Sequence, residues 1–398
     1  MLSLITAGES HGPELVAVLS GLPSGLRLSR EAIDRELARR QHGFGRGGRQ
    51  KIEKDQVEVR AGLRNGVTLG SPLVLAIRNR DFENWAKIMD PWETDPAQAA
   101  RRQVTAPRPG HADLAGAWKF NHREDLRNVL ERASARETAA RVAAGAVCKQ
   151  FLANFGVEVR SGVLALGEKV LHPGPPSFEL LAQVDDHSPL RTPFPEKEAE
   201  LVAYVEAVKH QGDTLGGIVG VVARGVPPGL GSYTQWDERL DGQLAQAVMA
   251  VQAVKSVVIG AGWEVALGPG SKAHDPIVPG TRGLRRSSNH AGGLEGGVTN
   301  GEDIVLRAAM KPISTLREPL PSVDLATLEA RPAAYERSDV TAVPALGVIL
   351  ENVVAFVLAR AFLAKFGGDH MDDVRASFEA YQKRLAGWGP EAFLTPNC

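Results

Sequence analysis

Residues 108–145 read RPGHADLAGAWKFNHREDLRNVLERASARETAARVAAG, and they contain the clearest helix start in the chain. Ser134 and Glu137 match the Ser-x-x-Glu capping box, in which each side chain binds a backbone N–H that the first helical turn leaves unpaired. An apolar face follows, formed by Ala139, Ala140, Val142, Ala143, Ala146 and Val147. Gly156 is a suitable end. The pattern predicts a long helix that begins just after Ser134 and presents one apolar face.

Two arginines lie at this helix start. Arg132 stands just before it, and Arg136 lies in its first turn. Because a helix N-terminus carries free N–H groups and a positive partial charge, arginines at this place favour an anion-binding site. The alternative is an ordinary capped helix on the surface.

Composition limits the classes into which the chain can fall. It has 398 residues, 43% of them hydrophobic, so it can bury one large core or two ordinary ones. The 46 basic and 47 acidic residues give a net charge of −1, which provides no overall attraction to nucleic acid or to a membrane. The two cysteines, Cys148 and Cys398, do not suggest a disulfide framework. A cytoplasmic protein is therefore expected.

Two segments bear on targeting and membrane insertion. The first residues lack a basic leader and an adequate apolar run, so no signal peptide is expected. Residues 345–366 are the most apolar later segment, but Glu351, Asn352 and Arg360 interrupt it. We therefore predict a buried helix there rather than a membrane span.

Periodicity and turn residues divide the rest of the chain. Helices are predicted at residues 30–40, 196–210, 240–254, 345–366 and 371–385. Strands are predicted at residues 2–7, 15–19, 57–63, 67–77, 157–166, 218–223, 257–259 and within 298–310. Asn65-Gly66 predicts a hairpin between two of these strands. Residues 81–106 read as irregular, and residues 172–195 as a loop.

Two parts of the sequence resemble each other weakly. GLPSGL at residues 21–26 is echoed by GVPPGL at 225–230, and each copy follows a predicted strand and precedes a predicted helix. Gly-Val-Thr recurs at residues 66–68 and 297–299. The pattern favours one domain with an internal pseudo-two-fold duplication and an active site where the halves meet. Chance repetition among 42 glycines is the alternative.

The segment HGFGRGGRQK at residues 42–51 is basic and rich in glycine. Its Gly-x-Gly-x-x-Gly spacing matches the dinucleotide-binding fingerprint, but that motif needs a strand before it and a helix opening on its last glycine. Since a helix is predicted before this segment, such a site is rejected. What remains is a group of arginines suited to phosphate or carboxylate, namely Arg39, Arg40, Arg46 and Arg49. A solvated basic loop and a weak RNA-binding segment are the alternatives.

Two histidines, His11 and His111, lie in glycine-flanked turns rather than on apolar faces. A histidine titrates near neutrality, and one held in such a turn suits proton donation. The alternative is ordinary polar surface. No His-x-x-His pattern or carboxylate cluster accompanies either residue, so no metal site is predicted.

Three further clusters suit a bound cofactor. Residues 287–297 read SSNHAGGLEGG, where paired glycines let a flat ligand or a phosphate approach the backbone. Residues 310–315 read MKPIST and place a cation and two hydroxyls beside a proline-fixed turn. Residues 336–339 read ERSD and offer a cation and a carboxylate together. An ion pair at a helix start is the alternative for this last cluster.

Six of these motifs together resemble the chorismate synthase family: GESHG, RPGHAD, RASARETAARVAAG, SNHAGG-x-x-GG, KPIST and RSD-V-x-AVP. They occur in order over nearly the whole chain. The resemblance implies an α+β fold, a β-α-β sandwich of two antiparallel sheets with outer helices, assembled as a homotetramer. A single catalytic domain would cover residues 1–386, with halves at about 1–156 and 200–370. Residues 387–398 would form a tail.

The same resemblance implies an activity. Members of the family bind reduced FMN and convert 5-enolpyruvylshikimate 3-phosphate into chorismate by anti-1,4-elimination of phosphate and a ring proton. This carbon–oxygen lyase reaction is the last common step of aromatic amino acid biosynthesis. Some members reduce their flavin with NADPH, and others need an outside reductant. The chain contains no separate reductase domain, so both alternatives stay open.

Residue roles follow from the resemblance, motif by motif. His11 would protonate the departing phosphate, and His111 would protonate the reduced flavin ring at N1. Asp339 would assist flavin N5 in removing the ring proton. The predicted flavin contacts are Arg132, Ala133, Ser134, Gln252, Ala253, Gly296, Lys311, Pro312, Ile313, Ser314, Thr315 and Arg337. The predicted binders of the substrate or of a nicotinamide phosphate are Arg40, Arg46 and Arg49.

The chain departs from the commoner family pattern at several positions. Ser338 replaces a histidine, Val340-Thr341 replaces Pro-Cys, and Gln252 stands where many members have asparagine. Leu114 stands where an aromatic residue is common. Because glutamine is longer than asparagine, the change at Gln252 bears on the relay around Asp339.

Two other classes compete with this reading. A phosphate-binding RNA protein would use the Gly/Arg segment, but the near-zero net charge and the lack of interleaved aromatic residues argue against it. A phosphosugar transferase would share the arginines without needing the flavin-type clusters.

Overall fold

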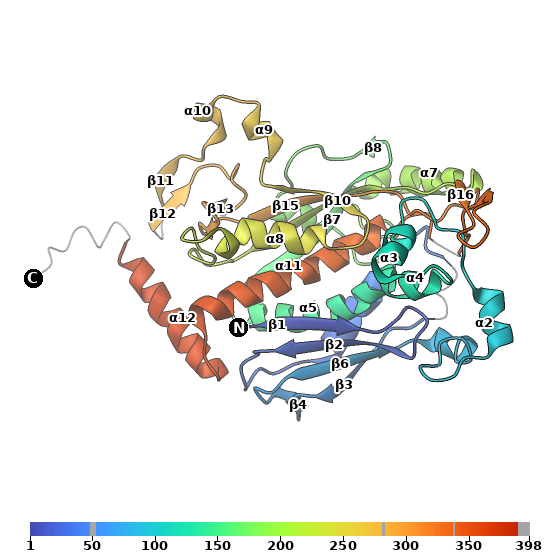
Figure 1. Ribbon diagram of the computed structural model, residues 1–398. Helices are drawn as coiled ribbons and strands as arrows, with labels where there is room; N and C mark the ends of the chain where they lie inside the picture. The colour runs from blue at the N-terminus through green and yellow to red at the C-terminus, as the bar shows by residue number, and fades with distance from the viewer. Residues whose placement is uncertain (48–52, 281–282, 337–338, 389–398) are drawn as a thin grey trace, which may run out of the picture.

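The computed structural model describes residues 1–47, 53–280, 283–336 and 339–388. Two antiparallel sheets enclose a layer of helices (Figure 1). The first sheet has the order β1-β2-β6-β3, and its strands are β1 (Ser3–Ala7), β2 (Glu14–Ser20), β3 (Val57–Ala61) and β6 (Leu73–Arg78). Side chains alternate along β2, where Leu15, Ala17 and Leu19 are buried. This period of two points one face of the sheet toward the helices.

The second sheet is built from the later part of the chain. Its order is β10-β15-β9-β7-β8, and its strands are β7 (Glu158–Leu166), β8 (Lys169–Val170), β9 (Gly217–Arg224), β10 (Val254–Ile259) and β15 (Ile304–Met310). All of its neighbouring strands pair antiparallel. The mixed helix and sheet class that the sequence predicts is therefore confirmed.

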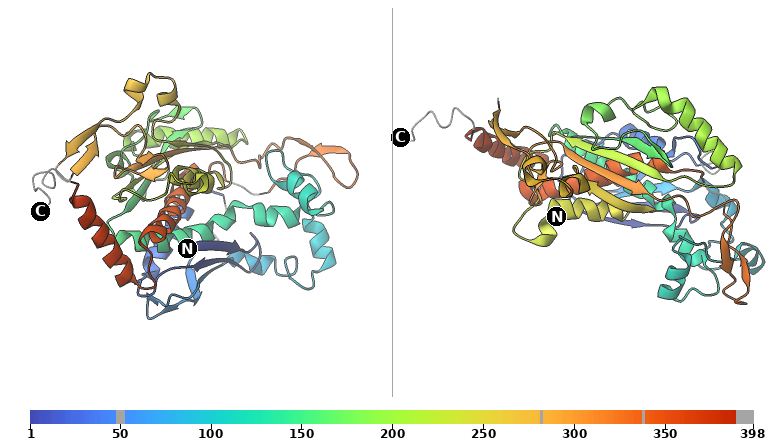
Figure 2. Two further views of the ribbon diagram at one scale, coloured as in Figure 1. Left: turned by 60° about the vertical axis from the view of Figure 1, so that its left-hand side comes forward. Right: turned by 90° about the horizontal axis from the view of Figure 1, so that it is seen from above.

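Four helices fill the space between the sheets: α1 (Arg30–Gln41), α5 (Thr138–Ala153), α8 (Leu240–Met249) and α11 (Val343–Phe366). Helix α5 packs against β2, β6 and α11, and α11 in turn packs against β7, β9 and α8. The left view in Figure 2 also places this layer between the sheets. The prediction that the helices lie outside the sheets is wrong for these four. Helices α5 and α11 are buried on nearly all sides, and such helices need cover on both faces.

The remaining elements lie around these layers. The other helices are α2 (Pro96–Arg102), α3 (Asp113–Phe120), α4 (Arg127–Ala133), α6 (Phe178–Leu181), α7 (Glu198–His210), α9 (Trp263–Ala266), α10 (Gly270–Ala273) and α12 (Met371–Ala386). Two-stranded hairpins are β4–β5 (Leu63–Arg64, Val67–Thr68), β11–β12 (Ile277–Gly280, Gly283–Arg286), β13–β14 (Leu294–Glu295, Val298–Thr299) and β16–β17 (Pro321–Val323, Ala330–Pro332).

Several sequence predictions need correction. The region 81–106 was expected to be irregular, yet it contains α2, whose start Asp95 caps by accepting from the N–H groups of Ala97 and Gln98. The loop predicted at 172–195 contains α6, which Ser177 caps. The helix predicted at 240–254 ends at Met249, since strand β10 begins at Val254. The hairpin at Asn65-Gly66 is confirmed as β4–β5.

The two sheets share one strand order. The orders β1-β2-β6-β3 and β7-β9-β15-β10 correspond strand for strand along the chain. The repeated motifs also make the same contacts: Thr68 Oγ1 accepts from Leu26 N and donates to Pro23 O, whereas Thr299 Oγ1 accepts from Leu230 N and donates to Pro227 O. This correspondence supports pseudo-two-fold halves, although their origin by duplication stays a prediction.

Helix α11 is long and apolar enough to cross a membrane by length and composition alone. In the structure, 89% of its most apolar segment is buried within the protein. The predicted buried helix at 345–366 is therefore confirmed. It is a core helix that contacts both α5 and the second sheet.

The contact between α5 and α11 depends on a glycine. A Cβ on Gly145 would lie 2.4 Å from Cβ and 2.4 Å from the backbone O of Asn352. We expect Gly145→Ala to lower the free energy of unfolding by about 1–3 kcal/mol, because the helices would have to separate. The control is Gly242→Ala in α8, where a Cβ meets nothing within 4 Å. It should leave stability unchanged or raise it by up to about 1 kcal/mol. Denaturant unfolding measures both, and equal stabilities would contradict the prediction.

Candidate functional site

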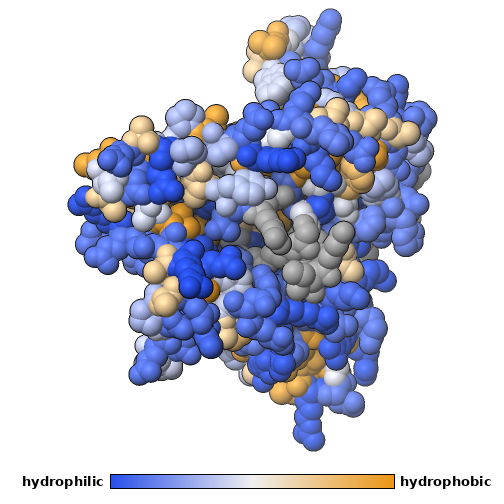
Figure 3. Space-filling model, turned by 90° about the vertical axis from the view of Figure 1, so that its right-hand side faces the viewer, coloured by the Kyte–Doolittle hydropathy of each residue, from blue (hydrophilic) through white to orange (hydrophobic). Residues whose placement is uncertain are grey.

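A cavity of about 1100 Å³ lies where segments of both halves meet. It is lined by predicted site residues from distant parts of the sequence: His11, Arg40, Arg46, His111, Ala133, Ser134, Gln252, Ala253, Lys311, Pro312, Ile313, Ser314, Thr315 and Asp339. Figure 3 shows the face that carries α2 and β16, on which hydrophilic residues predominate. The structure thus brings together most of the residues that the sequence singled out.

His11 is held by a buried carboxylate. Its ring Nδ1 lies 2.8 Å from Glu131 Oε1, and its backbone N donates to Glu131 Oε2 at 2.7 Å. Burial alone would raise the pKa of Glu131, but the contacts with His11 and Arg127 lower it overall. An ionised carboxylate at Nδ1 selects the tautomer with its proton on that nitrogen.

An aromatic ring fixes the plane of the same histidine. The rings of His11 and Trp85 stack with centroids 4.0 Å apart. Two guanidinium groups, of Arg102 and Arg127, each lie 4.8 Å from the Trp85 ring centroid. Trp85 is only 6% exposed. His11 is therefore fixed both by hydrogen bonds and by stacking.

His111 has a similar carboxylate partner. Its Nδ1 lies 2.5 Å from Asp113 Oδ1, and Asp113 is fully buried. Arg108 donates from Nε to Asp113 Oδ2 at 2.8 Å and from Nη1 to Thr315 Oγ1 at 3.1 Å. Burial would raise the pKa of Asp113, but His111 and Arg108 together hold it well below its ordinary value. Asp113 is thus a carboxylate that orients the ring and stabilises its protonated form.

Asp339 is paired rather than isolated. Arg46 Nη1 lies 3.0 Å from Asp339 Oδ2, and the backbone N of Gly47 donates to Asp339 Oδ1 at 2.5 Å. We call residues 43–47 the Arg46 segment. Arg46 Nε is buried without a hydrogen-bond partner among the described residues. An arginine with an unsatisfied buried donor at a cavity suits an anionic ligand.

Positive charge is concentrated beside this pair. Burial lowers the pKa of the Arg40 guanidinium to about 9, and the nearby Arg136 and Arg46 add to this effect, although Asp55 opposes it. Arg40 donates to Thr138 Oγ1 at 3.0 Å and to the backbone O of Ala135 at 3.0 Å, just before helix α5. A ligand anion would offset the mutual repulsion of these arginines.

The predicted capping box is only half present. Ser134 Oγ accepts from the backbone N of Arg136 at 3.3 Å, so it caps a 3-10 turn at Ala135–Glu137, whereas α5 itself begins at Thr138 and not just after Ser134 as predicted. The Glu137 side chain does not reach back to Ser134. It accepts from Thr6 Oγ1 at 2.7 Å, from Arg141 Nε at 3.0 Å and from Gln252 Nε2 at 3.2 Å. Glu137 therefore bonds to two residues distant in the sequence, Thr6 and Gln252, and to Arg141 one turn further along α5. Ser134 lines the cavity.

The two arginines at this helix start differ in their relation to the cavity. Arg136 is buried and donates to Asp55 at 2.7 and 2.8 Å and to Asn79 Oδ1 at 2.9 Å. Arg132 is partly exposed, donates to Thr6 O and Gly8 O, and does not line the cavity. Arg136 nevertheless lines the cavity, and its Nη2 has no hydrogen-bond partner among the described residues.

The turn at Gln252-Ala253 has features of a ligand contact. Gln252 Oε1 is buried and has no hydrogen-bond partner among the described residues. Ala253 has a left-handed φ of +67°, which is rare for a residue with a side chain. Lys311 donates to Gly110 O at 2.6 Å, and burial lowers its pKa. The unsatisfied amide oxygen is suited to accept from a ligand N–H.

Besides Arg132, three predicted contacts are not placed at the cavity. Gly296 lies in the turn of the β13–β14 hairpin and does not line it. Arg49 and Arg337 fall outside the described residues, as does Ser338. Their roles stay predictions.

Sequence reasoning missed several residues of the site, namely Trp85, Arg108, Asp113, Glu131 and Asp55. Arg108 and Asp113 flank His111 within RPGHAD, so their proximity could have been read from the motif. Glu131 lies 120 positions from His11, and no local pattern connects them. Only the fold brings that carboxylate to the histidine.

Comparison with known proteins gives consistent matches. A family model described as chorismate synthase matches residues 2–363. Chorismate synthase of Geobacter metallireducens is 52% identical over 389 residues, which covers 96% of this chain and 98% of that protein. The chorismate synthase of Thermus thermophilus is 52% identical over 391 residues, which covers 97% of this chain and 100% of that protein. A crystal structure of chorismate synthase matches with a TM-score of 0.77 and 43% identity, covering 97% of this chain and 98% of the other.

Proposed function

This chain belongs to the chorismate synthase family, and on that premise we propose that it converts 5-enolpyruvylshikimate 3-phosphate into chorismate with reduced FMN as cofactor. The observation that carries the proposal is one arginine-rich cavity in which two histidines each contact a buried carboxylate. In the reaction, a carbon–oxygen bond to phosphate breaks, a ring proton leaves, and phosphate is released. The reaction is redox-neutral overall.

The size of the cavity supports a site for two ligands. Its volume of about 1100 Å³ exceeds the roughly 300–1,000 Å³ of a typical small-molecule pocket. Reduced FMN would supply an electron-rich ring that loosens the carbon–oxygen bond. Residues that would hold it are Ala133, Ser134, Gln252, Ala253 and Lys311–Thr315. The buried, unpartnered Gln252 Oε1 fits a ring N–H donor.

Arg40 and Arg46 would bind the anionic groups of the substrate. Both line the cavity, and Arg46 has a buried Nε without a partner among the described residues. Burial is the main cause of the lowered pKa of Arg40, and binding an anion would relieve the repulsion from Arg136 and Arg46 that adds to it. The substrate carries a phosphate and carboxylates, which guanidinium groups bind bidentately.

The histidines would move protons. His11 would give a proton to the departing phosphate, with Glu131 stabilising the charged ring and Trp85 fixing its plane. His111 would hold a proton near the cofactor, with Asp113 fixing its orientation and Arg108 in turn holding Asp113 in place. Asp339 would take part in removing the ring proton, and its contacts with Arg46 and Gly47 fix where its carboxylate lies.

We also propose a cytoplasmic location and a homotetramer, both of which rest on the resemblance to the family. NADPH is proposed as a candidate reductant. Rapid mixing of NADPH with the FMN-bound protein, without another reductant, tests this directly by the loss of flavin absorbance.

The decisive test is phosphate release under anaerobic conditions. With dithionite-reduced FMN, the protein should release phosphate from 5-enolpyruvylshikimate 3-phosphate and form chorismate in equal amounts. Omitting FMN should abolish both. No phosphate release with reduced FMN would refute the proposal, and release that is independent of flavin would favour a phosphosugar transferase.

A further inference from the structure

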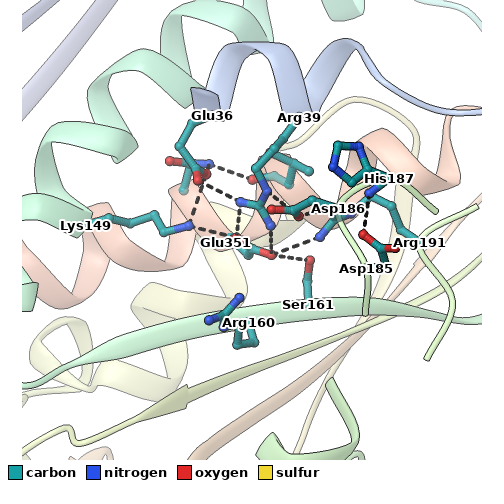
Figure 4. A network of polar contacts seen from close by, with 12 residues as sticks. Glu36, Arg39, Lys149, Arg160, Ser161, Asp185, Asp186, His187, Arg191 and Glu351 are labelled. Carbon is teal, nitrogen blue, oxygen red and sulfur yellow. Dashed lines mark hydrogen bonds and ion pairs between the residues drawn. The ribbon is translucent and has the colours of Figure 1, made fainter. Parts of the chain in front are cut away.

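A network of buried ion pairs lies in the helical layer, away from the cavity (Figure 4). At its centre, Glu351 of α11 is fully buried. Its carboxylate accepts from Arg39 Nη1 at 2.8 Å and Nη2 at 3.1 Å, from Lys149 Nζ at 2.8 Å and from Ser161 Oγ at 2.7 Å. These contacts tie α1, α5, α11 and β7 together.

The network extends from these helices to a surface loop. Asp186 Oδ1 accepts from Arg39 Nε at 2.8 Å and from Arg191 Nη1 at 2.9 Å. Arg191 is only 2% exposed and has a left-handed φ of +53°, so its backbone is held in a costly conformation. The half-exposed Asp186 therefore anchors the loop at residues 185–191 to the end of α1.

The same loop supports the Arg46 segment. The carbonyl of Pro189 accepts from the backbone N of Phe44 at 2.7 Å. One residue further, Gly45 O accepts from Val340 N at 2.7 Å. The next two residues of the segment contact Asp339 in the cavity. The loop thus holds one end of the segment, and residues 339–340 hold the other.

The end of α1 gives a second connection between the ion-pair network and the cavity. Arg39 and Arg40 are neighbours in the helix, so their side chains leave it about 100° apart. Arg39 lies in the network, whereas Arg40 lines the cavity. Fixing the first side chain therefore limits the movement of the second.

We propose that Asp186 is a positioning residue for substrate binding, which acts through loop 185–191 and the end of α1 to place Arg46 and Arg40 in the cavity. The proposal rests on the proposed function only for the identity of the substrate. Buried ion pairs often add little stability compared with apolar packing, and they can instead specify one arrangement. Here, the ion pairs would specify where Arg40 and Arg46 lie in the cavity.

Asp186→Asn tests the proposal, with Asp185→Asn as matched control. Asp185 is the adjacent loop residue, and its side chain accepts from His187 N within the loop. Asp186→Asn should raise KM for 5-enolpyruvylshikimate 3-phosphate about fivefold and leave kcat within about twofold. It should also speed hydrogen exchange of the backbone amides of the Arg46 segment. Asp185→Asn should change neither KM nor the rate of hydrogen exchange.

A second variant tests whether the effect of Asp186 passes through the Arg46 segment. A Cβ on Gly45, whose φ is +79°, would lie 3.0 Å from Val205 Cγ1 and 3.2 Å from Thr341 Cγ2. Gly45→Ala should therefore displace the Arg46 segment directly and raise KM as well. If both changes act through this segment, the effect of the double variant will be smaller than the product of the single effects.

The outcomes separate this proposal from the proposed function. Unchanged KM and unchanged exchange in Asp186→Asn, a fall in kcat at constant KM, or fully multiplicative effects would each overturn it. If the wild-type protein does not turn over the substrate, the proposed function fails. In that case, faster exchange in Asp186→Asn but not in Asp185→Asn still supports the positioning of the segment.

Discussion

Replacing His111 or His11 with alanine is expected to lower kcat by about 10²-fold or more, whereas FMN still binds. Each histidine lines the cavity and contacts a buried carboxylate, which is the arrangement of a residue that transfers protons. Alanine removes the proton carrier but leaves the predicted flavin contacts in place. Anaerobic steady-state kinetics and flavin fluorescence titration measure the two effects separately.

The carboxylate partners and a distant histidine serve as controls for this prediction. Glu131→Gln should lower kcat less than His11→Ala, because the amide keeps an acceptor oxygen but loses the charge that stabilises the protonated ring. His210→Ala, at the exposed end of α7, should leave kcat unchanged. Near-wild-type turnover in both active-site variants would refute the assigned roles.

The second large effect is expected on stability. Glu351→Gln should lower the free energy of unfolding by about 3–5 kcal/mol, because Arg39, Lys149 and Arg191 would then face an uncharged amide in the protein interior. The control is Glu158→Gln, which alters a half-exposed ion pair with Arg160 and should cost less than about 1 kcal/mol. Urea unfolding at neutral pH measures both, and a loss below about 1 kcal/mol for Glu351→Gln would contradict the prediction.

Lowering the pH should reduce the difference in the free energy of unfolding between the wild type and Glu351→Gln. Burial alone would raise the pKa of Glu351, but Lys149, Arg39 and Arg191 hold it well below its ordinary value of 4.5. Since the folded-state pKa lies below the unfolded-state pKa, the stabilisation is complete above about 4.5 and is lost as the pH falls toward the lowered value. Unfolding curves at several pH values below 5 test whether this stabilisation decreases as the pH falls.

The sequence predicted elements where local physics dominates. The hairpin at Asn65-Gly66 formed because its residues adopt left-handed backbone angles. The helix predicted at residues 30–40 formed as α1, and its start is stabilised by Ser29, whose side chain accepts from Ala32 N. The layer order was not predictable in the same way. Local patterns indicated apolar helices, but not that α5 and α11 would be covered by sheets on both sides.

The residues of the site differ in the same way in whether the sequence could indicate them. Motif by motif, the sequence indicated His11, His111, Asp339 and the turns around Gln252 and Lys311 as parts of one site, and the cavity contains them all. What it could not indicate are the partners of these residues. Glu137 illustrates this, because the capping box predicted a local bond to Ser134, whereas the folded chain offers it Thr6, Arg141 and Gln252 instead.

The sequence by itself therefore determined the family, the secondary structure near strong turn and cap signals, and the residue types of the site. Only the tertiary structure decided which helices lie between the sheets, that Glu131 reaches His11 and that Asp339 pairs with Arg46. The physical reason is distance along the chain. Caps and turns are settled by neighbours within a few residues, whereas a carboxylate finds a histidine 120 positions away only after the hydrophobic layers have packed.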